Sequence, residues 1–453
     1  MGKRMKKSAT LLLVVIFLMF FCAPVSLPVK GDSKRTLVVP DDYKTIGDAI
    51  GVAVEGDSIF VKKGTYHEQV LTINKTLSIN GENAKTTILK LHPPLIFGGW
   101  QSVVPCYYYD NSIKIYANGV ELSNFTIVRE ETSEAPADLA NHTLGKTKPP
   151  FIATGGGEIL VSGNQTTIVE NIVNAGLDVE GSYQIVADNT LASGVSCSGS
   201  YNNIFSNVVT GSGISVGGLA NQVYANDIVG EYKISTGIQS SGDGTIIANN
   251  SVLNCNAGLG IYRSYDGSAG SNNIFYGNNI TKNVYGIVVN GGNNNTFYGN
   301  ELVNNTVGAK VGYLEAPEPT ATFYHNNFIG SIEQVSLTTS VTYIAGVWSE
   351  PFYVAGFFDN DREGNYWSDY EGADSNGDGI GDTPYIIDAN RQDNYPHMAP
   401  FNISNINIPS TEASPEPSQI VSFTTSLAIT IASTIFVVGL GLLIYFKKYK
   451  QKS

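Results

Sequence analysis

One short phrase recurs eight times in the middle of this chain and limits its possible folds more than any other feature. The phrase is an apolar residue, two variable residues, an asparagine, one variable residue and a second apolar residue, and it runs from Ile168 to Phe328. Self-similarity at about 20 to 30 residues is typical of a stacked-repeat protein, in which each unit packs against its neighbours. The asparagines are Asn171, Asn189, Asn207, Asn226, Asn250, Asn278, Asn300 and Asn326.

The repeated units consist of strand and turn residues. They are rich in Val, Ile, Phe, Tyr, Thr, Asn and Gly, and poor in the residues that surface helices prefer. After most of the asparagines a glycine opens a second short strand, as in Gly176-Leu-Asp-Val179, Gly194-Val-Ser-Cys197 and Gly213-Ile-Ser-Val216. Units of this kind cannot bury their apolar face alone, so the sequence predicts an all-β fold, a parallel β-helix in which each coil pairs with the next.

The asparagines have a structural interpretation. At a bend between strands an asparagine can adopt left-handed backbone angles, and its amide both donates and accepts hydrogen bonds. We therefore predict that the eight side chains stack into a buried ladder, one rung per coil. An exposed row that recognises a ligand is the alternative.

Both termini carry membrane-targeting patterns. Basic residues precede the apolar run Leu11–Cys22, which predicts a signal peptide at 1–30, with an uncleaved anchor as the alternative. Residues 420–446 carry no charge and four lysines follow them, which predicts one transmembrane helix and a short cytoplasmic tail at 447–453. Residues 402–419 form a linker rich in Pro, Ser and Thr. The sequence thus predicts a single-pass membrane protein whose large N-terminal part is extracytoplasmic.

The charge balance bears on partners. The full chain has 27 basic and 40 acidic residues. Nine of the basic residues lie in the two terminal segments, so the part between them is strongly acidic. Nucleic acid is therefore not an expected partner, whereas cations are. Asn-x-Ser/Thr sequons, the first at Asn74, permit N-glycosylation in an extracytoplasmic location.

The chain divides into recognisable parts. We assign residues 37–358 to the β-helix, with a loop-rich insert at about 91–160, and residues 359–401 to a separate terminal segment. The spacing of apolar residues from Tyr43 to Val54 predicts a short helix that caps the open end of the first coil. Long loops are also where binding sites are usually found.

The sharpest local motif lies in the terminal segment. It runs from Asp374 to Asp382 and places oxygen ligands at the spacing of an EF-hand calcium loop. It departs from that pattern at loop position 12, where Tyr385 replaces a bidentate glutamate. We predict a calcium site that staples this segment, with a solvated acidic turn as the alternative. The predicted ligands are Asp374, Asn376, Asp378, the carbonyl of Ile380, and Asp382.

The motifs at the two ends of the domain resemble those of the NosD-like family. The C-terminal ones are Gly364-Asn-Tyr-Trp-Ser-Asp-Tyr370, Asp382-Thr-Pro-Tyr-Ile386 and Asp393-Asn-Tyr-Pro396, and the N-terminal ones include Val39-Pro40, Gly56-Asp57 and Gly64-Thr-Tyr66. The resemblance implies a right-handed, pectin-lyase-like β-helix of the type found in carbohydrate-binding proteins and sugar hydrolases. It also implies an association with copper. The sequence argues against copper, because the histidines, the cysteines and Met398 are scattered after the signal.

Candidate catalytic residues are few. Arg263, Asp243 and Asp266 lie near one another in sequence and could serve a polysaccharide lyase or a hydrolase, although an exposed turn is the simpler explanation. Asp178 and Glu180 are further acidic candidates. Eight tyrosines could stack on sugars along the rod, or could be ordinary packing residues: Tyr183, Tyr201, Tyr224, Tyr232, Tyr262, Tyr276, Tyr298 and Tyr324.

These observations favour a membrane-anchored, cell-surface β-helix that binds glycans or has a structural role at the surface, with a calcium-stabilised terminal segment. A carbohydrate-active enzyme, either a lyase or a hydrolase, is the alternative. An accessory role in copper handling comes third. An enzyme should show a compact cluster of carboxylates or arginine in a groove, whereas a binding module should show a flat face of tyrosines.

Overall fold

The computed structural model describes the chain in ten stretches. They are residues 34–101, 104–130, 152–154, 159–230, 235–262, 269–312, 320–337, 343–344, 347–348 and 355–403. Every described residue belongs to one compact unit, Met1–Ile403. The predicted signal peptide, transmembrane helix and tail, and nearly all of the linker, lie outside these stretches. Within the stretches, no helix has the length and apolar character needed to cross a membrane.

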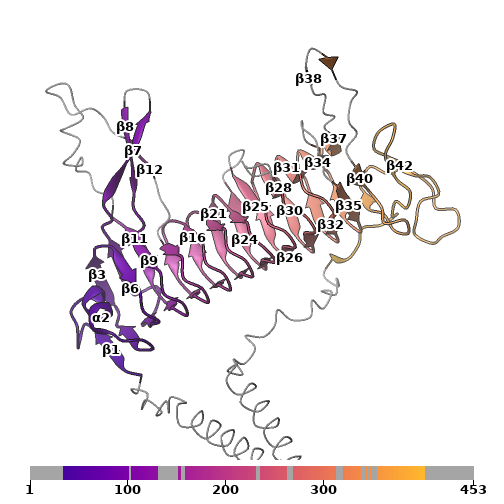
Figure 1. Ribbon diagram of the computed structural model, residues 1–453. Helices are drawn as coiled ribbons and strands as arrows, with labels where there is room; N and C mark the ends of the chain where they lie inside the picture. The colour runs from indigo at the N-terminus through magenta and orange to yellow at the C-terminus, as the bar shows by residue number, and fades with distance from the viewer. Residues whose placement is uncertain are drawn as a thin grey trace, which may run out of the picture. The chain divides into compact units, whose positions relative to one another are not determined.

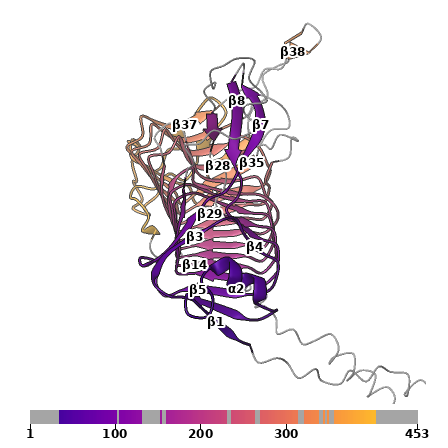
Figure 2. The same ribbon diagram turned by 90° about the vertical axis from the view of Figure 1, so that its left-hand side faces the viewer.

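The compact unit is a parallel β-helix made of three long sheets, one on each side of the coil, as Figures 1 and 2 show. Sheet A consists of β1 (Thr36–Val39), β2 (Ser58–Val61), β5 (Ser78–Gly81), β10 (Glu121–Ser123), β14 (Thr167–Val169), β17 (Ile185–Ala187), β20 (Asn203–Phe205), β23 (Gln222–Tyr224), β26 (Ile246–Ala248), β29 (Ile274–Tyr276), β32 (Asn295–Tyr298), β35 (Thr320–Tyr324) and β40 (Ala355–Phe357).

Sheets B and C complete each coil. Sheet B consists of β3 (Gly64–Glu68), β6 (Thr87–Leu91), β11 (Thr126–Arg129), β15 (Ile172–Val173), β18 (Thr190–Leu191), β21 (Val208–Gly211), β24 (Asp227–Gly230), β27 (Ser251–Leu253), β30 (Asn279–Thr281), β33 (Glu301–Val303), β36 (Asn327–Ile329) and β41 (Tyr366–Trp367). Sheet C consists of β4 (Leu71–Ile73), β9 (Ile113–Ile115), β13 (Ile159–Val161), β16 (Leu177–Val179), β19 (Val195–Cys197), β22 (Ile214–Val216), β25 (Thr236–Ser240), β28 (Ala257–Ile261), β31 (Tyr285–Val289), β34 (Val307–Val311) and β37 (Glu333–Leu337). The predicted all-β, right-handed parallel β-helix is confirmed.

Apolar side chains fill the inside of the coils in register. On sheet A, Ile168 pairs with Val186 and Val186 with Ile204, and all three are buried. Towards the C-terminal end the same row becomes aromatic, with ring centroids 4.4 Å apart between Phe275 and Phe297. Burying side chains of this size contributes about 2–3 kcal/mol each, so the interior stack is the main source of stability.

The eight asparagines of the repeated phrase form a buried ladder of hydrogen bonds. In each step the Oδ1 of one asparagine accepts from the Nδ2 and the backbone N–H of the asparagine one coil earlier. The Nδ2 of Asn189, for instance, donates to Asn207 Oδ1 at 3.0 Å and to the carbonyl of Ile168 at 2.8 Å. The steps run from Asn171 to Asn326, and a ninth rung follows because Asn326 Nδ2 donates to Asn365 Oδ1 at 2.9 Å. The amides are thus hydrogen bonded inside the core.

The left-handed residue at each bend is not the one that we expected. The ladder asparagines have no positive φ, whereas the residue before each one does, with φ of 55° at Asp188 and 54° at Ala225. The reason is that the asparagine N–H must point along the stack to reach the next Oδ1, as Asn189 N does to Asn207 Oδ1 at 3.0 Å. The preceding residue therefore turns the chain, and it is exposed or half-buried where it is not glycine.

The two ends of the β-helix differ in construction. At the N-terminal end a helix, α2 (Ile46–Val52), packs Ile46, Ala49 and Ile50 against the first coil, where the sequence predicts a helix. At the C-terminal end, β40 is the last strand of sheet A and lies within the predicted boundary at residue 358, whereas β41 extends sheet B beyond it. Part of the segment at 359–401 is therefore a final coil, which Trp367 closes with a side chain only 1% exposed.

Three smaller sheets complete the described structure. The strands β7 (Leu95–Gln101), β8 (Val104–Tyr109) and β12 (Ile152–Thr154) form a sheet that projects from the coils within the predicted loop-rich insert (Figure 1). The strands β38 (Tyr343–Ile344) and β39 (Val347–Trp348) form one two-stranded ribbon, and β42 (Tyr385–Ile386) and β43 (Gln392–Asp393) form another.

Candidate functional site

A groove runs along the bend between sheets B and C, and glycines of three successive coils line it. The residues at this bend are Asn174-Ala-Gly176, Ala192-Ser-Gly194 and Gly211-Ser-Gly213 in successive coils. A Cβ atom on Gly194 would lie 2.4 Å from the carbonyl oxygen of Gly213. The close approach of neighbouring coils therefore requires glycine here, and Gly176, Gly194 and Gly213 line the groove.

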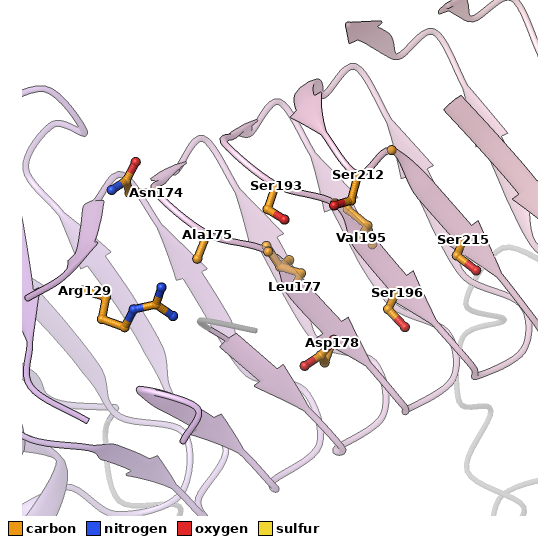
Figure 3. Close-up of a pocket in the computed structure, with 13 residues that line it drawn as sticks. Arg129, Asn174, Ala175, Leu177, Asp178, Ser193, Val195, Ser196, Ser212 and Ser215 are labelled. Atoms are coloured by element: carbon orange, nitrogen blue, oxygen red, sulfur yellow. The ribbon is translucent and has the colours of Figure 1, made fainter. Parts of the chain in front are cut away.

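The hollow spans several coils. Its largest part has a volume of about 390 Å³ and is lined by Arg129 at one end, by Asp178 on sheet C and by serines of the next two coils (Figure 3). A second hollow of about 310 Å³ shares Ser193, Ser212 and Ser215 with the first and extends to Gln239. The groove thus crosses at least four neighbouring strands of sheet C, β16, β19, β22 and β25.

The floor of the groove is a row of polar side chains in register. Asp178 pairs with Ser196, Ser196 with Ser215, and Ser215 with Gln239, and each lies between buried residues of its strand and points outwards. Gln239 Nε2 donates to Ser215 Oγ at 2.8 Å. Successive rungs are about 4.8 Å apart, as in any parallel sheet. The row therefore presents hydroxyl, amide and carboxylate groups at a regular spacing.

Asp178 is the one carboxylate among the groove-lining residues that the structure describes. Its pKa is raised, first because the carboxyl is half-buried and second because Glu180 lies nearby. Glu180 itself is exposed and its Oε2 accepts from Ser162 Oγ at 2.6 Å. Arg129 supplies a positive charge at the same groove (Figure 3). The site can thus hydrogen bond to a polar ligand and carries charges of both signs.

Of the catalytic candidates considered from the sequence, Asp178 lines this groove. Arg263 and Asp266 fall outside the described residues. Asp243 lies at an exposed turn, where its Oδ1 accepts from Ser271 N at 2.7 Å and supports the next coil. Four groove-lining residues were not predicted from the sequence: Arg129, Ser196, Ser215 and Gln239. A usable signal exists for the two serines and Asp178, because each stands two positions after the strand-opening glycine.

The tyrosines do not form one flat binding face. Tyr183 and Tyr201 are exposed and stack on each other with centroids 5.1 Å apart. Tyr276, Tyr298 and Tyr324 form another column, in which Tyr276 is 4% exposed and burial raises the pKa of Tyr298. This second column packs coil on coil, as the packing interpretation expects.

The predicted calcium loop folds back on itself around Asp374. Its Oδ1 accepts from Gly377 N at 2.7 Å and its Oδ2 from Gly379 N at 2.9 Å. Asp382 Oδ2 accepts from Ser375 N at 2.8 Å, and the pKa of Asp382 is lowered first by the Ser375 side chain and second by this backbone hydrogen bond. Gly377 and Gly379 have φ of 74° and 87°, which the tight turn requires. These hydrogen bonds thus hold the loop in a compact turn.

Comparisons with known proteins agree with the resemblance seen at the sequence level. Residues 115–313 match the family model described as "Periplasmic copper-binding protein (NosD)", a match that spans fewer than half of the residues of the chain. The NosD-like resemblance is thereby confirmed over that segment. No curated protein matches the chain.

Several solved structures are similar at low identity. The catalytic domain of a GH87 α-1,3-glucanase in complex with nigerose is 13% identical, with a TM-score of 0.40, over 70% of this chain and 69% of that chain. The Dettilon tailspike protein is 13% identical, with a TM-score of 0.42, over 67% and 68%. The A-module of a mannuronan C-5 epimerase from Azotobacter vinelandii is 12% identical, with a TM-score of 0.34, over 64% and 90%.

Proposed function

We propose that this protein is a glycan-binding module of the cell surface and that the groove along sheet C holds the glycan chain. The observation that carries the proposal is the row Asp178, Ser196, Ser215 and Gln239, which lines the floor of a groove that spans several coils. Concave sites with a few well-placed polar groups are the usual form of a binding site. A chain of repeating units suits a groove whose polar groups repeat at each coil.

The proposal includes a position outside the cell. The uncharged stretch at 420–446 with its basic stop supports a single membrane anchor, and the matched family is described as periplasmic. A glycan-binding domain on such an anchor would face surface polysaccharides. Protease treatment of intact cells tests this: the domain should be released while the lysine-rich tail stays protected.

We also propose that calcium binds the loop at residues 374–382 and staples the C-terminal end of the β-helix. The oxygen spacing of the sequence supports this, as do the positive φ angles of its glycines and the ionised state of Asp382. The loop is continuous with the final coil, since Met398 N donates to Gly379 O at 3.0 Å. Bound calcium would therefore act on the stability of that end rather than on the groove.

A carbohydrate-active enzyme is the second candidate, and the observation that favours it is Asp178, whose pKa is raised in a groove that also holds Arg129. Hydrolases of the usual type need two carboxylates beside the scissile bond. The described lining of the groove offers one. This count supports binding ahead of hydrolysis.

Copper handling remains the third candidate. The matched family is described as copper-binding. In the part of residues 115–313 that the structure describes, the soft ligands are Cys197 and Cys255, which are both buried free thiols. Burial raises the pKa of Cys197 to about 11, which disfavours the thiolate that metals bind. The matched segment thus gives copper little support.

The experiment that tests the proposal is a screen of the full-length protein, purified in mild detergent, against a panel of polysaccharides. Binding and the appearance of new reducing ends or unsaturated products are measured on the same samples. We expect binding without turnover, and we expect Asp178→Asn or Arg129→Ala to weaken it about tenfold, as the loss of one charged contact does. Turnover abolished by Asp178→Asn would instead establish the enzyme, and the absence of any bound polysaccharide would contradict both.

A further inference from the structure

Three consecutive strands of sheet B bring two histidines and a glutamate together near the N-terminal end. β3, β6 and β11 are neighbours, with His67 paired to Lys90 and Lys90 paired to Val128. His92 and Glu130 immediately follow β6 and β11, and their N–H groups continue the ladder to Glu68 O at 3.1 Å and Leu91 O at 2.8 Å. The backbone of the sheet therefore fixes the three side chains beside one another on its outer face.

The side-chain atoms converge on one carboxylate oxygen. Glu130 Oε2 lies 2.6 Å from His92 Nε2 and 3.3 Å from His67 Nδ1. One atom from each residue can be chosen so that all three lie within 4.8 Å of one another, and in the described part of the chain this is the one such group of three His, Cys, Asp or Glu residues. The two imidazole rings have centroids 6.0 Å apart. The nitrogens thus face a common point from two coils.

Lys90 holds the glutamate in this position. Its Nζ lies 2.8 Å from Glu130 Oε1, which leaves Oε2 for the histidines. An orienting partner on the second oxygen is what metal-binding carboxylates commonly have. A basic residue could also belong to a plain ion network, in which the histidines donate to the glutamate and no metal takes part. The two arrangements differ in whether a cation replaces the imidazole protons.

The spacing suits a metal ion. Bonds of about 2.0–2.1 Å at a tetrahedral angle put two ligand atoms about 3.3 Å apart. The distance from Glu130 Oε2 to His67 Nδ1 already has that value, and the one to His92 Nε2 needs to lengthen by less than 1 Å. Two imidazoles and one carboxylate form a ligand set that suits Zn²⁺ and its first-row neighbours rather than Ca²⁺ or Mg²⁺. Solvent exposure of both imidazoles leaves a coordination position open.

We propose that His67, His92 and Glu130 form a binding site for a divalent first-row transition-metal ion of the Zn²⁺ class. The ion has three protein ligands and a fourth position for water or for an oxygen of a bound molecule. It joins three coils across sheet B and thereby fixes the chain at the point where it leaves β11. The site shares no residue with the proposed glycan groove or with the calcium loop, so each of the three proposals has its own test.

Isothermal titration of the full-length protein with ZnCl₂ tests this, in mild detergent, without a histidine tag and in excess calcium. One zinc ion should bind for each chain. His67→Ala, His92→Ala and Glu130→Gln should each weaken binding at least tenfold, and Co²⁺ should give the visible absorption of a nitrogen- and oxygen-ligated ion. Because the histidines are exposed, these variants should fold, and thermal unfolding checks this, with His67→Gln as a second variant.

Two matched controls complete the design. His325→Ala removes the other described histidine that pairs with a glutamate, since His325 Nε2 lies 2.7 Å from Glu363 Oε2, and it should leave zinc binding unchanged. Asp374→Ala, in the calcium loop, should also leave it unchanged. Zinc binding that survives both His67→Ala and His92→Ala would overturn the proposal, and so would the absence of stoichiometric binding by the folded protein.

Discussion

The two ends of the β-helix are each built around a buried aspartate, but in opposite electrostatic settings. At the N-terminal end Asp57 lies 2.5 Å from the guanidinium of Arg35 and accepts from Val54 N, and the hydrogen bond from Arg35 lowers its pKa to about 2. At the C-terminal end Asp393 accepts N–H groups of Asn365, Trp367 and Tyr395, and burial raises its pKa to about 6.

The difference shows what a neighbouring cation does for a buried carboxylate. Both groups accept several N–H donors, which favour the ionised form, but only Asp57 has a guanidinium to offset desolvation. The negative charge of the nearby Asp359 raises the pKa of Asp393 further. We therefore expect acid to weaken the N-terminal end and neutral pH to weaken the C-terminal end. Four predictions follow this contrast, from the largest expected effect to the smallest.

Trp367→Ala should have the largest effect and should be confined to the C-terminal end. The indole stacks on Phe328 and Tyr385 at 4.3 Å each and donates from Nε1 to Asp393 at 2.8 Å. Truncation of a buried tryptophan costs about 3–5 kcal/mol. Hydrogen exchange should accelerate in β41 to β43 and stay slow in α2 and β1. The control Tyr366→Ala, at a half-buried neighbour, should cost less than about 1 kcal/mol, and equal exchange at both ends would contradict the contrast.

Asp393→Asn should remove the pH dependence of the stability of the C-terminal end. Because the folded pKa lies above the unfolded value, the folded end binds the proton more tightly, so its stability is full below about pH 4 and is lost as the pH rises through about 6. The loss reaches at most about 3 kcal/mol by pH 7. Exchange rates in β43 measured from pH 4 to pH 7, corrected for intrinsic rates, should show this trend in the wild type and not in the variant. If the C-terminal end of the wild type instead becomes more stable from pH 4 to pH 7, the hydrogen bonds to Asp393 lower its pKa more than burial raises it.

Asp57→Asn should remove a pH dependence of the opposite sign, that of the stability of the N-terminal end. The lowered pKa means that this carboxylate contributes stability above its unfolded pKa, and the contribution is lost as the pH falls through about 2. At pH 7 the substitution should cost about 1–2 kcal/mol, because Arg35 is half exposed and water partly solvates it once its partner is gone. Exchange in α2 and β1 at pH 7 measures the cost, with Asp41→Asn in the exposed pair with Lys62 as the control. Unchanged exchange in α2 would contradict the assignment.

Calcium should have the smallest effect and should act at the C-terminal end alone. At ten times its dissociation constant a bound ligand stabilises by about 1.4 kcal/mol. Exchange in the residues 365–400 should slow on addition of calcium, and Asp374→Ala should abolish the response. If calcium changes exchange at neither end and calorimetry shows no binding, the loop is a turn without a metal.

The sequence predicts the coils well and the sites poorly. The asparagine ladder can be predicted from the sequence because one asparagine per coil repeats with the same apolar flanks. Its last rung, Asn365, cannot be predicted in this way, since it comes 39 positions after Asn326 and inside a different motif. A second column mixes residue types, with Gln184 bonded to Asn202 and Thr245 to Asn273, so no single letter reveals it.

The groove and the metal cluster depend on register between coils of unequal length. Ser196, Ser215 and Gln239 fall into one row only after β19, β22 and β25 are aligned, although they are 19 and 24 residues apart. His67, His92 and Glu130 likewise appear scattered until β3, β6 and β11 pair. Side-chain chemistry that is spread over several coils is therefore visible only in the fold.

The most direct test of the glycan groove is to fill it and leave the rest of the surface unchanged. Ser196→Tyr places a large side chain in the middle of the groove, and Ser251→Tyr makes the same change at an exposed strand position of sheet B that does not line it. Equilibrium binding to the polysaccharide found in the screen should weaken at least tenfold for Ser196→Tyr and stay unchanged for Ser251→Tyr. Equal affinity of the two variants and the wild type would contradict a binding site in the groove.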